Sequence, residues 1–263
     1  MPRRGRLLSA RWAAVLGSPV AHSLSPVLHR AAYADLGLRW SYAAIECTVP
    51  QLVPELAAAR TDPGFGGFSL TMPLKEAVLG LLDEVGTDLG AVNTVLPRQG
   101  RLVGLNTDSD GVAAALAELA PAPGPAAVLG AGGTARAAVA ALRRLGREPD
   151  VLARRPLPDL LGARVLPWSG FDPGGYAVVV ATTPHGATDA LAERGWPRRT
   201  ALLDVLYAPW PTRLAAVAEG AGAVVVGGLA VLVGQAVEQV VAMTGARPSA
   251  AVLRAAGESA LGS

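Results

Sequence analysis

Short apolar runs alternate along the first half of the chain with segments in which apolar residues recur at helical spacing. Apolar runs closed by glycine or polar residues are typical of buried strands, and the 3.6-residue spacing is typical of helices with one buried face. We expect strands at 12–16, 41–47 and 67–71, and helices at 25–36, 50–60 and 73–82. This order favours a mostly parallel sheet with helices on both faces.

Two further strands, 92–95 and 101–104, and a helix at 108–120 precede a proline-rich boundary at 121–125. The alternation then begins again. We expect strands at 126–129, 150–153, 176–181, 201–205 and 224–226, and helices from the turn at 130–133 to 145, and at 211–220, 229–243 and 249–256. The fold class is therefore α/β with two α/β domains. Periodicity leaves open whether the C-terminal helices close the second domain or pack on the first.

The composition supports two domains and excludes several classes of protein. A chain of 263 residues, of which 51% are hydrophobic, can bury two cores. The net charge is only +2 and the arginines are scattered, which argues against a nucleic-acid partner. No apolar run approaches the roughly 20 residues that cross a bilayer. We expect a cytoplasmic protein with no membrane contact and a loose basic tail at 1–10.

Residues that bind metals are too few to form a site. Cys47 is the only cysteine, which excludes an internal disulfide and a thiolate metal cage. The histidines, His22, His29 and His185, are isolated, although the first two could share a helix face. Ordinary structural roles are the simpler interpretation of all three. We therefore expect no metal.

One amine stands out against the arginines. The chain has 22 arginines but only Lys75, and its only asparagines are Asn93 and Asn106. Arginine does not exchange protons near neutrality, whereas lysine can. A lone amine near the only asparagines indicates a site that needs those groups. The alternative is a lysine that survived by chance on a solvated helix face.

A glycine-rich turn marks the start of the second series. Gly130-Ala131-Gly132-Gly133-Thr134 follows a predicted strand and opens a predicted helix. This is the context of a dinucleotide-binding turn, in which glycines let the backbone approach a diphosphate at a helix N-terminus. The alternative is an ordinary turn in a protein rich in alanine and glycine.

The next strand ends in Ala153-Arg154-Arg155, where NAD-binding proteins carry an acidic residue for the ribose 2′-hydroxyl. An acid would repel a 2′-phosphate, whereas guanidinium groups pair with it. A charge-assisted hydrogen bond contributes roughly 1.5–3 kcal/mol, enough for about a ten- to hundredfold preference. The sequence therefore predicts NADP(H) as the cofactor.

Polar side chains gather at the predicted strand ends of the first half, in the segments 23–26, 71–76, 90–94 and 104–108. Ligands of open α/β sheets collect at the carboxyl ends of strands. Hydroxyls, a carboxamide, an amine and a carboxylate meeting there would suit a small polyhydroxylated acid.

These segments, together with the glycine turn, resemble the shikimate dehydrogenase family from about residue 12 to 258. The resemblance implies reversible reduction of 3-dehydroshikimate to shikimate by NADPH, in the shikimate pathway of aromatic amino-acid biosynthesis. It also implies a substrate domain of 1–107 plus 229–263, a Rossmann-like NADP-binding domain of 108–228, and a monomer or homodimer. The C-terminal helices would return to the substrate domain.

The resemblance also implies roles for individual residues. Lys75 and Asp108 match the family's catalytic pair and would face each other beside the hydride donor. The substrate carboxylate and ring hydroxyls would be bound by Ser23, Ser25, Thr71, Asn93, Tyr207 and Gln235. NADP(H) would be bound by Gly130, Ala131, Gly132, Gly133, Thr134, Ala153, Arg154, Arg155, Thr182, Thr183, Pro184, Val205 and Gly228.

Three positions depart from the family pattern. Ser69 and Ala181 stand where asparagine is usual, and Val231 stands where methionine commonly touches the nicotinamide. These departures concern the packing of the cofactor and leave Lys75 and Asp108 intact.

Simpler interpretations and other activities stay open at this point. Ser25 and Asp108 could cap the helices that follow them, and Asn106 would shape a turn. A quinate/shikimate dehydrogenase lacks support because no acid lies near Arg154. An enzyme resembling glutamyl-tRNA reductase would need Cys47 as a nucleophile. A non-catalytic NADP-binding sensor would use the same fold.

Overall fold

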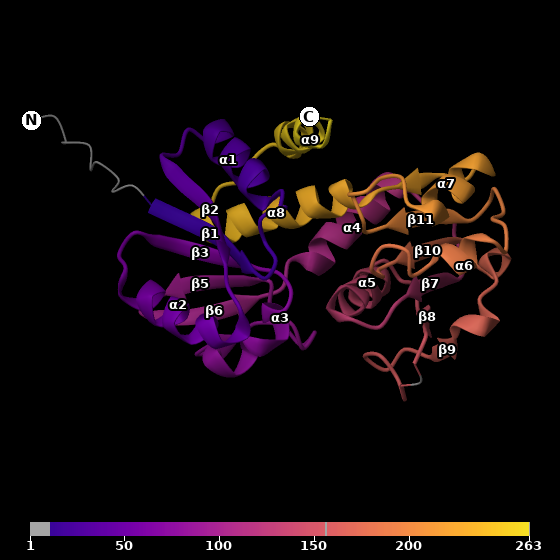
Figure 1. Ribbon diagram of the computed structural model, residues 1–263, viewed down its shortest axis with the longest axis horizontal. Coiled ribbons are helices and arrows are strands. Elements are labelled where there is room, and N and C mark those ends of the chain that lie inside the picture. The colour runs from indigo at the N-terminus through magenta and orange to yellow at the C-terminus, as the bar shows by residue number, and fades with distance from the viewer. Residues whose placement is uncertain (1–10, 156, 263) are drawn as a thin grey trace, which may run out of the picture. The chain divides into compact units, whose positions relative to one another are not determined.

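A computed structural model describes residues 11–155 and 157–262 (Figure 1). The predicted tail at 1–10 lies outside the described residues. Contacts within the chain divide it into two units, one of 11–106 with Gln239–Ala260 and the other of Thr107–Glu238 with 261–262. Each unit contains one six-stranded sheet.

The first unit has a mixed sheet in the order β2-β1-β3-β5-β6-β4 (Figure 1). Its strands are β1 Arg11–Gly17, β2 Trp40–Glu46, β3 Phe65–Leu70, β4 Glu84–Val85, β5 Thr94–Arg98 and β6 Arg101–Leu105. β1 runs parallel to β2 and β3, whereas β5 runs antiparallel to β3 and β6. The expected parallel sheet is thus confirmed for the first three strands, and a hairpin extends it.

Helices cover both faces of this sheet. They are α1 Ser25–Asp35, α2 Val49–Thr61, the short α3 Leu74–Ala77, the end of α8 Gly228–Thr244, and α9 Ala250–Leu261. Successive strand residues point to opposite faces. Leu16 and Phe68 accordingly pack in the same core as Leu56 of α2, and Tyr33 of α1 contacts Met243 of α8.

The second unit has an all-parallel sheet in the order β12-β11-β10-β7-β8-β9. Its strands are β7 Ala126–Leu129, β8 Pro149–Ala153, β9 Val165–Pro167, β10 Val178–Ala181, β11 Ala201–Asp204 and β12 Val225–Val226. The chain winds outward from β7 through β8, and then returns to the other side of β7 as β10. This is the doubly wound order, and its reversal point lies between β7 and β10.

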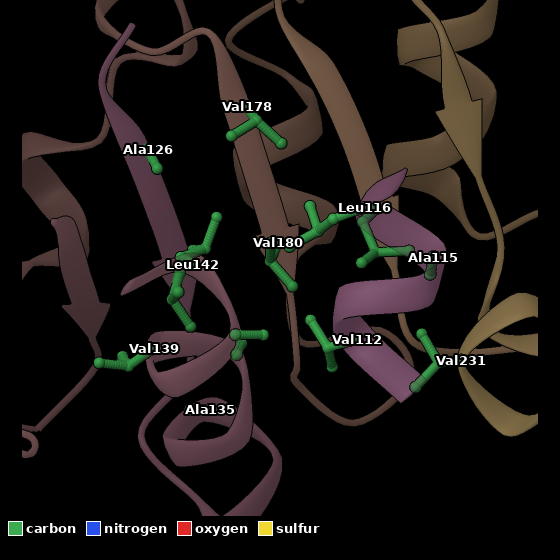
Figure 2. Packing of buried hydrophobic residues seen from close by; sticks show 14 of the residues in the cluster. Val112, Ala115, Leu116, Ala126, Ala135, Val139, Leu142, Val178, Val180 and Val231 are labelled. Atoms are coloured by element: carbon green, nitrogen blue, oxygen red, sulfur yellow. The ribbon is translucent and has the colours of Figure 1, made fainter. Parts of the chain in front are cut away.

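Two layers of helices enclose the second sheet. They are α4 Asp108–Leu119, α5 Gly133–Arg144, α6 Asp189–Ala192, α7 Arg213–Gly220 and the start of α8. Figure 2 shows one face, where Val180 of β10 lies between Val139 of α5 and Val112 of α4. On the other face, Val179 shares a core with Leu214 of α7. Each fully buried side chain of this size contributes about 1.5–3 kcal/mol.

Several boundaries differ from the sequence predictions. The helix expected at 73–82 is only α3 followed by a 3₁₀ turn at Leu79–Leu81, because Gly80 is a poor helix residue. The last helix, expected to end at 256, continues to Leu261 through Gly257, which is buried. The short elements β4, β9 and α6 were not predicted, since two to four residues carry too little periodicity. No helix among the described residues has the length and apolarity to span a membrane.

Candidate functional site

The carboxyl ends of β1 and β3 form a close backbone contact in the first unit. A Cβ at Gly17 would meet the Thr71 side chain at less than the 3.0 Å that real Cβ atoms require. The Thr71 N–H donates to Leu16 O (2.9 Å), and the Ser18 N–H donates to Met72 O (2.9 Å). Glycine at 17 therefore lets Thr71 lie beside the end of β1.

Ser23 and Ser25 lie in the turn that enters α1. Ser25 is the first helical residue and Leu24 occupies the N-cap, so Ser25 does not take the capping role considered as its simpler alternative. The Ser23 hydroxyl instead accepts from the Ser25 N–H at 3.2 Å. Pro26 fixes the backbone of the first turn, because its ring presets the helical φ angle. The Ser23 hydroxyl is therefore held against the backbone at the start of α1.

Lys75 and Asn93 are tied to the end of β3 through backbone hydrogen bonds. Lys75 lies on α3, and its carbonyl accepts from the Val92 N–H (2.8 Å). The Asn93 carbonyl accepts from the Leu70 N–H (2.8 Å). Asn106 Nδ2 donates to Ala91 O (2.8 Å), so its side chain joins the end of β6 to the segment before β5. Two of the predicted site residues, Lys75 and Asn93, thus belong to adjoining segments.

Asp108 opens α4 in the second unit. It is the first helical residue and Thr107 occupies the N-cap, so Asp108 does not sit at the capping position considered from the sequence. Its side chain is almost fully buried. A carboxylate in the first turn is stabilised by the positive end of the helix dipole.

The glycine turn between β7 and α5 has the features that a diphosphate requires. Gly130 has φ +119°, and a Cβ there would lie 2.6 Å from Thr182 Oγ1, so only glycine fits. Gly132 is the N-cap of α5 and has no side chain to accept from the first-turn N–H groups. Those N–H groups lie at the reversal point of the sheet, where helix N-termini of this fold class can bind an anion.

Arg154 and Arg155 follow β8 and are both exposed. The Arg154 guanidinium lies over the ring of Trp168, 5.7 Å from its centroid. The indole is fixed in turn, because Trp168 Nε1 donates to Leu152 O (2.7 Å). Stacking on an aromatic face holds a guanidinium without using its donors. The residues of this unit therefore fit a dinucleotide with a 2′-phosphate.

Polar side chains at the ends of β10 and β11 are also fixed. Thr182 Oγ1 donates to Leu129 O (2.8 Å), which connects β10 to the glycine turn. Asp204 accepts from Thr212 Oγ1 (2.7 Å) and from the Leu206 N–H (3.1 Å). Burial raises the pKa of Asp204. These bonds set the path of the turn that carries Val205 and Tyr207.

The start of α8 packs tightly against this turn and against α4. The Gly228 N–H donates to Leu206 O (2.9 Å), and a Cβ at Gly228 would overlap Val205. A Cβ at Gly111 of α4 would likewise overlap the backbone carbonyl of Val231. The same Cβ would lie 3.0 Å from the Gln235 backbone N. Small residues at this crossing fix the position of Gln235 along α8.

The remaining sequence hypotheses concern cysteine and histidine. Cys47 is fully buried, its Sγ points to Thr48 O, and burial raises the pKa of the thiol, all of which disfavour a nucleophilic role. His29 is buried within α1, whereas His22 lies exposed before the helix, so the two do not share a helix face. The described residues contain no cluster of His, Cys, Asp and Glu that could hold a metal.

Comparisons with known proteins identify the family of this chain. The family model of the shikimate dehydrogenase substrate binding domain matches residues 15–95. A shikimate dehydrogenase (NADP(+)) from Thermus thermophilus is 40% identical over 262 residues, which covers 95% of this chain and 98% of the relative. The chain belongs to the shikimate dehydrogenase family.

Solved structures with different named activities share the fold. Shikimate 5-dehydrogenase from Thermus thermophilus, in complex with NADP(H) and shikimate, matches with a TM-score of 0.87 at 38% identity over 95% of this chain and 99% of that one. A 5-ketofructose reductase from Gluconobacter matches with a TM-score of 0.84 at 26% identity, over 96% and 99%. The fold by itself therefore does not fix the substrate.

The departures from the shikimate dehydrogenase pattern lie in buried positions. Val231 belongs to the core of the second unit (Figure 2), and Ala181 ends β10 within the other core. Ser69 is buried in β3 and bonds to two polar side chains from elsewhere in the chain. Sequence reasoning missed those two, Tyr42 and Gln239, as well as Trp168 beneath Arg154.

Proposed function

We propose that this protein is an NADP-dependent shikimate dehydrogenase, which catalyses the reversible reduction of 3-dehydroshikimate to shikimate. The observation that carries the proposal is the 40% identity with an NADP-dependent shikimate dehydrogenase across 95% of the chain. The resemblance places the reaction in the shikimate pathway. The stacked Arg154 and the glycine turn support NADP(H) independently of the comparison.

The nicotinamide cofactor, when bound, supplies or accepts the hydride. The N–H groups at the start of α5 would bind its diphosphate, and Arg154 with Arg155 would bind its 2′-phosphate. The segment from Thr182 to Pro184 and the turn at Val205 would line the nicotinamide side. In this scheme the chain binds and orients the cofactor through its second unit.

Lys75 and Asp108 are the proposed catalytic groups. Negative charge develops on the carbonyl oxygen of 3-dehydroshikimate during reduction, and the Lys75 ammonium would stabilise it and donate the proton. The Asp108 carboxylate would orient the amine through a charge-assisted hydrogen bond. In the oxidative direction the pair would take the proton back, and a coupled pair acts as one unit.

The other polar residues would bind substrate. Ser23, Ser25, Thr71 and Tyr207 are proposed for the carboxylate. Asn93 and Gln235 are proposed for the ring hydroxyls. The fixed positions of the Ser23 hydroxyl at the start of α1 and of Thr71 beside Gly17 support this assignment, since a prepared site loses less entropy on binding.

The test is an absorbance assay at 340 nm with shikimate and NADP. We expect turnover with shikimate, less with quinate, and none from a Lys75→Ala variant prepared in the same way. A protein that binds NADP but leaves the absorbance unchanged would be a sensor. Turnover of quinate with NADP, or of 5-ketofructose with NADPH, exceeding that of shikimate with NADP would reassign the substrate.

We also propose that the enzyme works in the cytoplasm as a monomer or homodimer, as the family resemblance implies. Light scattering after size exclusion distinguishes the two states. A larger assembly would contradict the proposal.

A further inference from the structure

A continuous series of hydrogen bonds runs through the interior of the first unit. It consists of Tyr42 Oη to Ser69 Oγ (2.7 Å), Ser69 Oγ to Gln239 Oε1 (2.9 Å), Gln239 Nε2 to Thr94 Oγ1 (3.2 Å), and Thr94 Oγ1 to Asn93 Oδ1 (2.8 Å). None of these five side chains is more than 3% exposed. The series joins β2, β3 and α8 to the residue proposed to hold a ring hydroxyl.

The direction of the first half of this series is fixed by a backbone carbonyl. Gln239 Nε2 lies 3.2 Å from the Asn93 carbonyl oxygen, which can only accept. The amide nitrogen must therefore face Asn93, and its oxygen must face Ser69. The single proton of the Ser69 hydroxyl is then donated to Gln239, and Tyr42 must donate to Ser69.

The second half has the same direction. Gln239 Nε2 has only protons to offer, so the Thr94 hydroxyl accepts from it. The proton of Thr94 is then available for Asn93 Oδ1. The Asn93 carboxamide is thereby oriented with its oxygen toward Thr94 and its Nδ2 turned away from Thr94. If the Asn93 carboxamide were rotated by 180°, its Nδ2 would face the Thr94 hydroxyl in place of Oδ1.

We propose that Gln239 and Thr94 are positioning residues, which set the Asn93 carboxamide so that Nδ2 is the atom that donates to a substrate hydroxyl. This inference rests on the proposed function. It also accounts for Ser69, because the carboxamide that the family pattern has at position 69 is supplied here by Gln239 from α8. Buried polar groups are costly unless each is paired, so the orientation is strongly held.

The first test separates the shape of Thr94 from its hydroxyl. Thr94→Val keeps the shape and removes the donor, and Thr94→Ser keeps the donor. We expect Thr94→Val to raise KM for shikimate about tenfold, the equivalent of one hydrogen bond, with KM for NADP and kcat nearly unchanged. Thr94→Ser should restore KM to about the wild-type value. Equal KM values in the two variants would overturn the proposal.

A double-mutant cycle shows whether Thr94 acts through Asn93. In an Asn93→Ala background, Thr94→Val should raise KM no further, because the carboxamide it orients is gone. Additive effects would overturn the proposal. Gln239→Met, a change of similar size, provides a second variant that releases the Thr94 hydroxyl and should also raise KM for shikimate.

A spectroscopic test does not depend on turnover. With only two asparagines, protein labelled with ¹⁵N-asparagine gives two pairs of side-chain amide resonances, and Asn93→Ala identifies one of them. Thr94→Val should move the Asn93 pair and leave the Asn106 pair in place, while Thr94→Ser should move neither strongly. An unmoved Asn93 pair would refute the positioning role. Absence of shikimate turnover with the expected shifts would refute the proposed function alone.

Discussion

Lys75 is the only lysine among 23 lysines and arginines, and a lysine can act as a proton donor where an arginine cannot. Lys75→Arg keeps the positive charge and removes the proton donor. We expect kcat to fall at least about a hundredfold, as the loss of general acid catalysis does, while KM for shikimate changes far less. Steady-state kinetics in both directions provide the measurement. Near-normal turnover would leave the lysine only an electrostatic role.

Trp168 is expected to influence the choice of cofactor through Arg154. Removing the stacking surface with Trp168→Leu should lower the ratio of kcat/KM for NADP to that for NAD about two- to fivefold, the value of an exposed cation–π contact. Arg154→Ala should lower it about ten- to a hundredfold. Calorimetry with 2′,5′-ADP and 5′-AMP measures the same preference without turnover. Equal losses for both nucleotides in Trp168→Leu would contradict this role.

Among the helices, the crossing of α4 and α8 depends on the absence of a side chain at Gly111. Gly111→Ala places a methyl group against the Val231 carbonyl. We expect the free energy of unfolding to fall by about 1–3 kcal/mol, as overpacking usually costs, and Gln235 to move. Urea denaturation measures the loss.

Gly220→Ala is the matched control for that substitution. Gly220 ends α7 in the same unit, and a Cβ there meets nothing within 4 Å. This change should leave stability unchanged or raise it by up to about 1 kcal/mol, because alanine is the better helix residue. A similar loss from both substitutions would show that close packing at Gly111 is not the cause.

The sequence predicted best those elements that have either a continuous apolar run, as β7 has, or a clear helical spacing of apolar residues, as α4 has. β7, whose four residues are all buried, was predicted at its observed bounds, and α4 within one residue. The antiparallel hairpin of β5 and β6 altered the expected parallel sheet, because strand direction depends on connections and not on periodicity.

The candidate site was predictable only where its residues follow strands. Thr71 and the turn at Gly130 could be recognised because each comes directly after a predicted strand. Gln239 could not, because its partners Ser69 and Thr94 are 170 and 145 positions away. A single polar residue within an apolar helix gives no indication of which side chains will meet it. The shared position of Lys75 and Asp108 stays a prediction.

At the scale of the whole molecule, His29 makes stability depend on pH. Burial lowers its pKa from 6.5 to about 4, and its ring stacks on Tyr42 with centroids 4.0 Å apart. Because the unfolded state binds the proton more readily, stability is highest above pH 6.5 and falls as pH drops toward 4. We expect a loss of about 2 kcal/mol between pH 7.5 and 5 from this group.

The variant His29→Phe isolates that contribution, since phenylalanine keeps an aromatic ring beside Tyr42. Urea denaturation of both proteins at pH 7.5 and 5 gives the comparison. The wild type should lose more stability than the variant over this interval. Parallel losses would mean that groups other than His29 govern the acid response. The raised pKa of Asp204 acts in the opposite direction, because it makes the folded state bind a proton more readily.

Because Lys75 on α3 is the only lysine of the chain, the enzyme can also be labelled chemically at a single side chain. Reductive methylation with ¹³C-formaldehyde attaches isotopic reporters to one lysine side chain and to the α-amino group, without any mutation. Because Lys75 is partly exposed, reagent can reach it in the folded state. Two resonances would then follow the arrival of each ligand, and the side-chain signal would report from the place where the reaction is proposed to occur.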